Sequence, residues 1–356
     1  MKLIRIFFKI LGALILLAIF FLITASLIAT FTNYNPPDRE ILKSTDKMLD
    51  DRIDKDRISL MSWNIGYAGL GEKMDFFYDG GSKVRPTREY YNETYKGIRS
   101  FLLKNDSIDF LLLQEVDKKA HRSYRNNQVK KINGLFPGHQ SVFAKNYDVL
   151  FVPVPINNPM GKVIAGLMTL SKYEAVTNER ISFPGNFAWP KSIFMLDRCF
   201  ILQRFTTKNG KILVLINTHN SAFDDGSLRE QQFALLRQTA LEEHSKGNFV
   251  IIGGDWNQNP PGFNPSLITN GDVPRKHDLP NVPDNFMPHG WRWAFDTSVP
   301  TNRDVSEPYI KGQTSTTILD YFLISPNLQL LNVETIDLAF KDSDHNPVIV
   351  EVRFLE

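Results

Sequence analysis

The stretch 249–257, FVIIGGDWN, constrains the fold more than any other part of the chain. Its first five residues carry no charge and are mostly β-branched or aromatic, which is typical of a strand buried on both faces. Gly253 and Gly254 then allow a sharp turn of the backbone, and Asp255 and Asn257 follow at alternate positions. On an extended backbone, side chains two residues apart point to the same side, so this pair can serve one site. A simple turn that closes the strand explains the same residues equally well.

A second constraint lies at the N-terminus, where residues 10–37 carry no charge and residues 11–31 are almost wholly apolar. The run meets the roughly 20 residues that a bilayer-spanning helix needs. We therefore expect a transmembrane signal-anchor helix at 10–31, after a cytoplasmic N-terminus at 1–9. The basic residues before the run favour this orientation, which makes the chain a single-pass membrane protein with its catalytic domain outside the cytoplasm. A cleaved signal peptide is the alternative.

The composition leaves room for one large domain behind this helix. The chain has 356 residues, of which 42% are hydrophobic and 22% charged. We expect a juxtamembrane stalk at 32–57, partly helical from Asp38, and a catalytic domain at 58–356. Residues 32–356 hold 38 Lys and Arg against 39 Asp and Glu, so the totals show no basic footprint of a dedicated nucleic-acid binder. Cys199 is the only cysteine, which excludes an internal disulfide and a multi-cysteine zinc site.

Periodicity along the domain predicts many strands and few helices. Strands are expected at 58–64, 108–113, 148–154, 163–170, 200–206, 211–216, 317–324 and 347–354. Helices are expected at 87–104 and 227–243, with a loop or short helix at 117–133, and Asn209-Gly210 predicts a hairpin. The pattern indicates mixed sheets packed together with helices outside. The long irregular stretch 258–315 is typical of a functional loop region.

Polar side chains recur at or near the ends of the predicted apolar strands. Each alone has a structural explanation, such as a turn cap, a surface ion pair or a histidine at a sheet rim. Asp320 is harder to explain in this way, because a carboxylate between Leu319 and Tyr321 must be paired or solvated. Together the residues predict one site assembled from strand ends. They are Asn64, Glu115, His219, Asp255 with Asn257, Asp320, and the Asp344-His345 pair before the last strand.

These residues lie in short motifs that resemble those of the endonuclease/exonuclease/phosphatase superfamily, the DNase I-like fold. The motifs occur in that family's order and span about 58–354: SWNI at 62–65, LQEV at 113–116, NTH at 217–219, GDWN at 254–257, LDYF at 319–322 and SDH at 343–345. The resemblance implies an α+β four-layer sandwich, in which two mixed β-sheets pack face to face with helices outside. It also implies a metal-dependent phosphoric ester hydrolase.

The resemblance further implies a metal site. Glu115 is similar to the family's main metal carboxylate, Asn64 lies beside it, and Asp344 resembles a metal-side carboxylate. A hard cation held by few carboxylates and several waters suits Mg²⁺, with Mn²⁺ as the alternative ion.

The catalytic positions carry over in the same way. Asp255 and Asn257 resemble the pair that positions the attacking water and a phosphate oxygen. Asp320 and His345 resemble an Asp–His pair in which the carboxylate fixes the imidazole tautomer. His219 resembles a donor to the scissile phosphate or leaving oxygen. The sequence leaves the division between acid and base open.

Two departures bear on the substrate. The family's usual apolar residue after Thr-His is replaced by Asn220, and Arg198 precedes a predicted strand where it can clamp a phosphate. Both are candidate substrate-binding residues. A surface arginine that pairs with Asp197 or Glu179 is the alternative for Arg198. The loop 118–128 and the segment 184–198 fall outside the family motifs.

The preferred function is a membrane-tethered phosphodiesterase that acts on lipid or small-molecule phosphodiesters by metal-assisted water attack. A nuclease is the alternative, and a non-catalytic anchored binding module is a third reading. The implied partners are a phosphoester substrate and the bilayer around residues 10–31, and no protein partner is implied. An aromatic-rich stretch favours the lipid reading, although core packing explains it equally well. It comprises Trp256, Phe263, Phe286, Met287, Trp291, Trp293 and Phe295.

Overall fold

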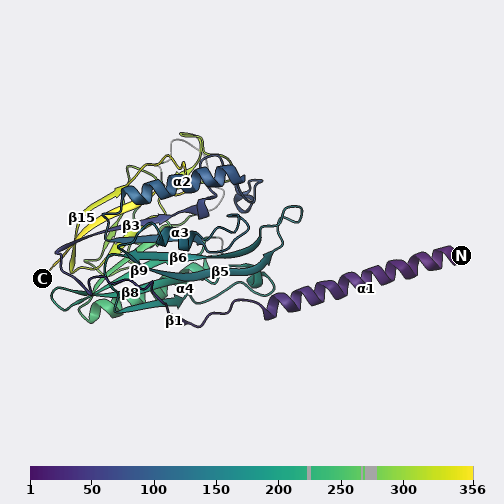
Figure 1. The fold of residues 1–356 in the computed structure, drawn as a ribbon, viewed down its shortest axis with the longest axis horizontal. Helices are drawn as coiled ribbons and strands as arrows, with labels where there is room; N and C mark the ends of the chain where they lie inside the picture. The colour runs from purple at the N-terminus through teal and green to yellow at the C-terminus, as the bar shows by residue number, and fades with distance from the viewer. Residues whose placement is uncertain (223–225, 266–267, 269–278, 356) are drawn as a thin grey trace.

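Two mixed β-sheets pack face to face in the computed structural model, which describes residues 1–222, 226–265, 268 and 279–355 (Figure 1). The first sheet has the order β1 (Arg39–Ile41), β7 (Thr177–Ser182), β8 (Cys199–Thr207), β9 (Ile212–His219), β10 (Phe249–Asp255), β14 (Asp320–Ile324) and β11 (Arg292–Ala294). A further strand, β2 (Arg52–Ile53), pairs with β8. The second sheet has the order β15 (Leu328–Thr335), β16 (Val348–Phe354), β3 (Arg57–Asn64), β4 (Phe110–Asp117), β6 (Gly161–Ser171) and β5 (Gln140–Val152). The strands β12 (Asn302–Arg303) and β13 (Thr316–Thr317) form a small separate ladder.

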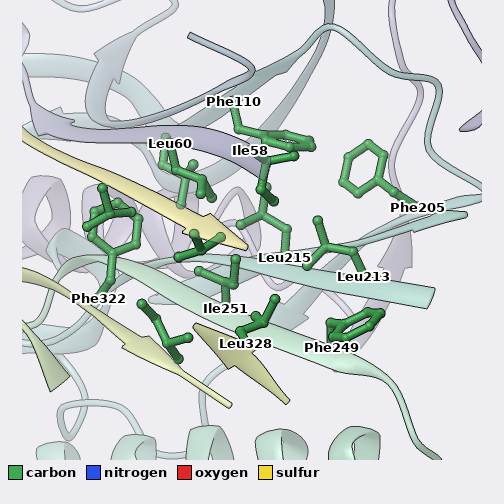
Figure 2. Close-up of a cluster of buried hydrophobic side chains, with 14 of the residues drawn as sticks. Ile58, Leu60, Phe110, Phe205, Leu213, Leu215, Phe249, Ile251, Phe322 and Leu328 are labelled. Carbon is green, nitrogen blue, oxygen red and sulfur yellow. The ribbon is translucent and has the colours of Figure 1, made fainter. Parts of the chain in front are cut away.

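The space between the sheets is filled by alternate side chains of their central strands. Ile58 and Leu60 of β3 belong to the same buried cluster as Leu213 and Leu215 of β9 and Ile251 of β10 (Figure 2). All five side chains are nearly inaccessible to water. Burial of an aliphatic side chain of this size contributes about 1.5–3 kcal/mol. This cluster fixes how the two sheets face each other.

Helices cover the outer faces of both sheets, which confirms the four-layer sandwich. The second sheet packs against α2 (Arg88–Lys104) and α3 (Gln128–Asn133), through a cluster that includes Ile98 and Ile132. The first sheet packs against α4 (Ser227–Ser245) through Phe233 and Leu236. Short 3-10 helices occur at Gly66–Ala68, Phe77–Asp79 and Lys191–Phe194. The two predicted long helices are confirmed to within two residues.

The aromatic-rich stretch belongs to the core beneath α4 and not to an exposed interface. Trp256 is fully buried and stacks on Tyr321 at 5.2 Å between ring centroids, and Phe263 and Met287 are also buried. The remaining members of the stretch are partly buried and pack against the same cluster: Phe286, Trp291, Trp293 and Phe295. Core packing is therefore their explanation, and they carry no argument for a lipid interface.

The segment 32–57 corrects a second expectation, because it lies along the sheets and contains no helix from Asp38. Residues 39–41 form β1, which pairs antiparallel with β7. The backbone N–H of Thr45 donates to the carbonyl of Ser141 at 3.0 Å. The polar, charged sequence of this segment resembles a stalk, but its backbone groups complete exposed edges of the domain.

The N-terminal helix α1 (Lys2–Phe31) is long and apolar enough to cross a membrane, and none of its residues is buried. It leaves the domain as a single projecting rod (Figure 1). A signal sequence satisfies the same criteria of length and composition.

Elsewhere the turn between β8 and β9 is confirmed at Asn209-Gly210, where Gly210 has φ +74°. The described part of the irregular stretch 258–315 contains only the short strands β11 and β12, and residues 266–267 and 269–278 lie outside the described residues.

Candidate active site

The sheet topology brings the predicted polar residues to one edge of the sandwich. Strands β3 and β4 run parallel, as do β9 and β10, so that Asn64 lies beside Gln114 and His219 beside Asp255. Strand β14 is antiparallel to β10 and begins at Asp320, opposite Asp255. Strand β16 is antiparallel to β3 and begins just after His345. Strand ends and strand beginnings therefore meet at the same edge.

Polar bridges join the two sheets at this edge. The amide Nδ2 of Asn64 donates to Asp255 Oδ2 at 2.9 Å, and one layer deeper Gln114 Nε2 donates to Asn217 Oδ1 at 2.8 Å. Asn64, Gln114, Asn217 and Asp255 are all buried, so their polar groups need such partners. The apolar core thus ends in a hydrogen-bonded polar layer that supports the site.

The two glycines before Asp255 allow close packing and do not make a turn. Strand β10 continues through both to Asp255. A Cβ atom on Gly254, which has φ +151°, would lie 2.0 Å from the carbonyl oxygen of Thr218 in β9. A Cβ atom on Gly253 would lie 2.3 Å from the ring of Phe322. The chain bends only at Asn257, which has φ +51°.

Asp255 and Asn257 nevertheless line the same cavity. The backbone N–H of Asn257 donates to Asp255 Oδ1 at 3.0 Å, and both side chains line the cavity described below. The amide Nδ2 of Asn257 donates to the carbonyl of Asn220 at 2.8 Å, which fixes the direction of its amide group.

Asp320 and His345 form the closest charged contact of the site. Asp320 Oδ2 lies 2.7 Å from His345 Nδ1, and both residues are buried. The indole N–H of Trp63 donates to the His345 carbonyl at 2.9 Å, which fixes the backbone beside the ring. The Nε2 atom of His345 lies 3.7 Å from Asp255 Oδ2 and 3.9 Å from Asp344 Oδ2. The imidazole is therefore held on one side and directed at carboxylates on the other.

These carboxylates decide the charge of the ring. Burial lowers the pKa of His345, but Asp320, Asp255 and Asp344 outweigh it and raise this pKa to about 10. Burial raises the pKa of Asp320 to about 7, against the opposing effect of His345. The pair is short and buried, and a charged imidazole is its favoured state near neutral pH. The amide nitrogen of Asn302 lies 2.9 Å from Nε2, so a charged ring requires this amide to present its oxygen in place of its nitrogen.

His219 lies in the opposite electrostatic environment. Its Nε2 atom is 3.4 Å from Asp255 Oδ2, but burial and the positive charges of Arg198 and His345 lower its pKa well below the usual value. The approach to Asp255 is consequently that of a neutral ring and not an ion pair. The site thus contains one charged and one neutral histidine on either side of the same carboxylate.

Glu115 and Asp344 are the carboxylates that fit a cation. Burial raises the pKa of both, and among the described residues neither forms an ion pair with a lysine or arginine. Glu115 has φ +55° at an irregularity in the pairing of β4 with β6, between Leu113 and Val116. A non-glycine residue in this conformation costs free energy and is typical of a functional position. Partly buried oxygen ligands of this kind suit Mg²⁺ or Mn²⁺.

Asn64 is close to this pair, with Nδ2 3.5 Å from Glu115 Oε1. Its amide oxygen accepts the N–H of Gly66 at 3.0 Å, so Asn64 would ligate a metal through oxygen only after rotation of the amide. The described residues also include one compact group of ligand atoms, within 4.8 Å of one another, from Asp255, Asp320 and His345. Since Asp320 and His345 already bond each other, we expect the ion on the side of Glu115.

Two arginines lie beside these carboxylates. Arg198 lines the cavity, where its guanidinium approaches the His219 carbonyl at 3.5 Å, and Glu179 pairs instead with Arg39 and Arg204. Arg122 is buried, forms a two-point contact with Asp117 at 3.0 and 3.3 Å, and stacks 3.8 Å from the centre of the Tyr67 ring.

The side chain of Asn220 does not lie in the cavity, where a substrate-binding residue is expected. Its side chain is fully buried and accepts a hydrogen bond from Thr218 Oγ1 at 2.8 Å, and it does not line the cavity. Its backbone carbonyl orients Asn257, as described above. The substrate-binding role of this side chain stays a prediction.

The site opens into a cavity of about 400 Å³. Its lining includes the strand-end group, namely Asn64, Glu115, His219, Asp255, Asp344 and His345. The lining also includes parts of 67–79 and 185–196 with Tyr147 and Met160, which we call the loop wall. The loop wall is rich in aromatic and aliphatic side chains, among them Phe76, Tyr78 and Phe187. The cavity therefore suits a substrate with a phosphate at one end and an apolar part at the other.

Sequence reasoning missed two residues that support the site, of which only Asn302 lines the cavity. Asn302 approaches His345 from β12, and Thr301 Oγ1 accepts the backbone N–H groups of Leu319 and Asp320 at 2.8 and 3.0 Å. Both lie inside the long irregular stretch, where no motif distinguishes them. The only signal was the unusual length of that stretch.

Comparisons with known proteins agree with this architecture. The sequence model described as the Endonuclease/Exonuclease/phosphatase family matches residues 61–345. Comparison with curated proteins gives no match.

Several solved structures share the fold. An endonuclease/exonuclease/phosphatase from Beutenbergia cavernae DSM 12333 aligns with a TM-score of 0.53 at 16% identity, over 85% of this chain and 72% of that one. D. rerio TDP2 in complex with a single-strand DNA product aligns with a TM-score of 0.53 at 15% identity, over 84% of this chain and 100% of that one. ANGEL2, described as a 2',3'-cyclic phosphatase, aligns with a TM-score of 0.54 at 16% identity, over 88% of this chain and 98% of that one.

Proposed function

Because this chain belongs to the endonuclease/exonuclease/phosphatase family, whose members hydrolyse phosphate esters, we propose that it is a membrane-tethered, metal-dependent phosphodiesterase. The proposed substrates are lipid or small-molecule phosphodiesters. The observation that carries the proposal is the lining of the cavity, which combines the strand-end group with a loop wall rich in aromatic and aliphatic side chains. A phosphodiester with an apolar substituent contacts both walls at once.

The positions of the side chains support a division of roles. Asp255 accepts hydrogen bonds from Asn64 and Asn257, so its carboxylate is oriented and can hold the attacking water. Asn257 lines the cavity with its amide direction fixed, which suits contact with a phosphate oxygen. The uncharged His219, close to Asp255, suits a hydrogen bond to the phosphate or the leaving oxygen.

His345 is assigned to charge stabilisation. Its raised pKa keeps the ring protonated at neutral pH, so it donates from Nε2 to the developing negative charge and does not remove a proton. Asp320 holds the ring through Nδ1 and is a positioning residue. Glu115, with Asp344 and Asn64 nearby, would hold a divalent cation, which would supply Lewis-acid polarisation of a phosphoryl oxygen.

Tethering by α1 is part of the proposal. The helix is apolar over its length apart from basic residues near its start, which favours a cytoplasmic N-terminus and an extracytoplasmic domain. Protease added to intact cells or spheroplasts tests this placement. We expect the protease to digest the C-terminal domain. If the domain stays protected after the outer barriers are opened, it lies in the cytoplasm and the proposed topology is wrong.

A nuclease is the second candidate, favoured by Arg122 and Arg198 in the cavity wall and by the fold shared with TDP2, which was solved with a DNA product. The loop wall and the charge balance of residues 32–356 favour the first candidate.

A substrate panel decides between the two. The full chain is reconstituted in nanodiscs with Mg²⁺ and offered a choline phosphodiester lipid, bis(p-nitrophenyl) phosphate and single-stranded DNA. Preferential hydrolysis of the lipid supports the proposal, and preferential cleavage of DNA establishes the nuclease. Hydrolysis of none of the three, with the protein folded, indicates a binding module.

A further inference from the structure

Exposed apolar side chains gather at one end of the domain. Outside α1, the large hydrophobic residues exposed in the described part of the chain are few, and four of them lie on the hairpin between β5 and β6. The stretch 150–160, LFVPVPINNPM, contains no charged residue. We call five residues the hydrophobic tip: Leu150, Phe151, Val154, Ile156 and Trp189, with exposed fractions of 54%, 49%, 39%, 93% and 63%.

The hydrophobic tip lies where α1 meets the domain. The indole N–H of Trp189 donates to Thr30 Oγ1, in the last turn of α1, at 3.2 Å. Immediately after the helix, the ring of Tyr34 lies under Lys145 of β5, with Nζ 3.9 Å from the ring centre. The hairpin between β5 and β6 extends from the domain on the side on which α1 leaves it (Figure 1). A bilayer that contains α1 therefore has its surface on this side of the domain.

The same segments form the loop wall of the cavity. Met160, at the end of the hairpin loop, lines the cavity, and its backbone N–H donates to the carbonyl of Val154 at 3.0 Å. Phe187 and Lys191, which precede and follow Trp189 in the sequence, also line the cavity. The hydroxyl of Tyr147 in β5 donates to the carbonyl of Phe194 at 3.0 Å and joins the two segments. The cavity and the hydrophobic tip thus share one end of the domain.

We propose that the hydrophobic tip docks on the bilayer that holds α1, so that the cavity receives the phosphodiester headgroup of a membrane lipid. This inference rests on the tether and the hydrolysis proposed above. Exposed aliphatic and aromatic side chains, four of them in a stretch that carries no charged residue of its own, are suited to the headgroup–acyl boundary. The Lys191 ammonium, 3.8 Å from the centre of the Phe187 ring, lies beside the cavity, where it suits the lipid phosphate.

Docking is tested by fluorescence on the full chain in phosphatidylcholine nanodiscs. A polarity-sensitive dye is attached at Ile156→Cys, and the natural Cys199 is buried and does not react. The control is Val176→Cys, which is 61% exposed and follows the other end of β6. The dye at position 156 is expected to shift its emission to the blue and to be quenched by nitroxide-labelled lipids. The dye at position 176 is expected to do neither.

Equal, water-like emission at both positions overturns the inference. A blue shift at position 156 that lipid nitroxides do not quench, and that depends on protein concentration, assigns the hydrophobic tip to a second copy of the chain and also overturns it. Neither readout depends on turnover, so docking is decided even if the proposed hydrolysis is wrong.

A second experiment connects docking to substrate. The double variant Phe151→Asp/Ile156→Asp is compared with Val176→Asp on a choline phosphodiester lipid in the nanodisc and on soluble bis(p-nitrophenyl) phosphate. Loss of buried apolar contact predicts about a tenfold or greater loss on the lipid. Hydrolysis of the soluble ester is expected to stay unchanged, and Val176→Asp is expected to change neither. An equal loss on both substrates, or no loss on the lipid, contradicts the inference.

Discussion

The strand-end group and the loop wall face the same cavity but are built in different ways. The strand-end group is set at the ends of core strands and held by short hydrogen bonds, such as the 2.7 Å contact of Asp320 with His345. The loop wall is rich in aromatic and aliphatic side chains and lies mostly on segments between strands, as Tyr78 and Phe187 do. Rigid elements suit residues that must be positioned for chemistry, and loops suit residues that select a substrate. Changes in the first region should therefore lower kcat, and changes in the second should raise KM.

The largest effect is expected from Asp255→Asn. This change keeps the size of the side chain but removes the carboxylate that lies between His219 and His345. We expect kcat on a soluble phosphodiester to fall by about 10³-fold. The control is Asp106→Asn, an exposed acid beyond the end of α2, which should be unaffected. A fall in kcat of less than tenfold, with the fold intact, would remove Asp255 from the chemistry.

The next effect concerns Asp320 and His345 as one unit. Asp320→Asn, His345→Ala and the double variant should all fall to a similar rate, about 10²-fold below the natural enzyme. Groups that act together lose their effect when either is removed, so the losses are not multiplicative. The measurement is kcat for all three variants. A double variant that shows the product of the two single losses means that the residues act independently.

A smaller effect is expected from Arg198→Ala, which removes a cation from beside the strand-end group. The loss of one charge-assisted contact to a phosphate corresponds to about a tenfold increase in KM. Arg204→Ala is a poor control because Arg204 pairs with Glu179 and Glu243. Arg99→Ala, an exposed position on α2, is preferable. A change confined to kcat would place Arg198 in the chemistry and not in substrate binding.

The last prediction concerns protonation and not the rate of hydrolysis. The two histidines of the site should titrate at different pH values. The pKa of His345 is raised to about 10 and that of His219 is lowered, so at pH 7 the NMR signals should show one charged and one neutral ring. The raised value also affects stability. The folded chain binds the proton more tightly than an unfolded histidine with pKa ~6.5, so this stabilisation is complete below about pH 6.5 and is lost as the pH rises towards 10. As the pH rises from about 6.5 towards 10, the thermal stability of His345→Ala should therefore fall less than that of the natural protein. Two rings that both titrate near 6.5 would contradict the assignment.

Much of the fold follows from the sequence where strands are buried on both faces. Strands β4 and β10 are continuous apolar runs, and both are predicted from that pattern. The outer strands β7 and β15 are missed because they are polar or only half buried. In β7 the buried Arg180 is supported by the carbonyls of Lys145 and Asp197, contacts that no local pattern reveals.

The same distinction applies to the site. Asn64, Glu115, Asp255, Asp320 and His345 lie in motifs at strand ends, and the sheet topology brings them together. The places of Asn302 and Arg122 in the site cannot be read from a local pattern. Asn302 lies in the long irregular stretch without a motif and contacts His345. Arg122 stacks on Tyr67, which is distant in sequence. The sequence left the interface and the core as equal explanations for Trp256, because an aromatic residue suits both, and the structure places it in the core. The exposure of an aromatic side chain is set by tertiary packing and not by its own type.

Phosphoester hydrolysis by this chain should require a divalent cation at Glu115. The direct test measures turnover of bis(p-nitrophenyl) phosphate by the full chain in excess chelator and after Mg²⁺ is restored, for the natural enzyme and for Glu115→Gln, with Glu174→Gln as an exposed control. We expect that chelation abolishes turnover, that Mg²⁺ restores it in the natural enzyme and the control, and that Glu115→Gln stays inactive although folded. Full turnover in chelator, or full turnover by Glu115→Gln, would mean that no cation at Glu115 takes part in hydrolysis.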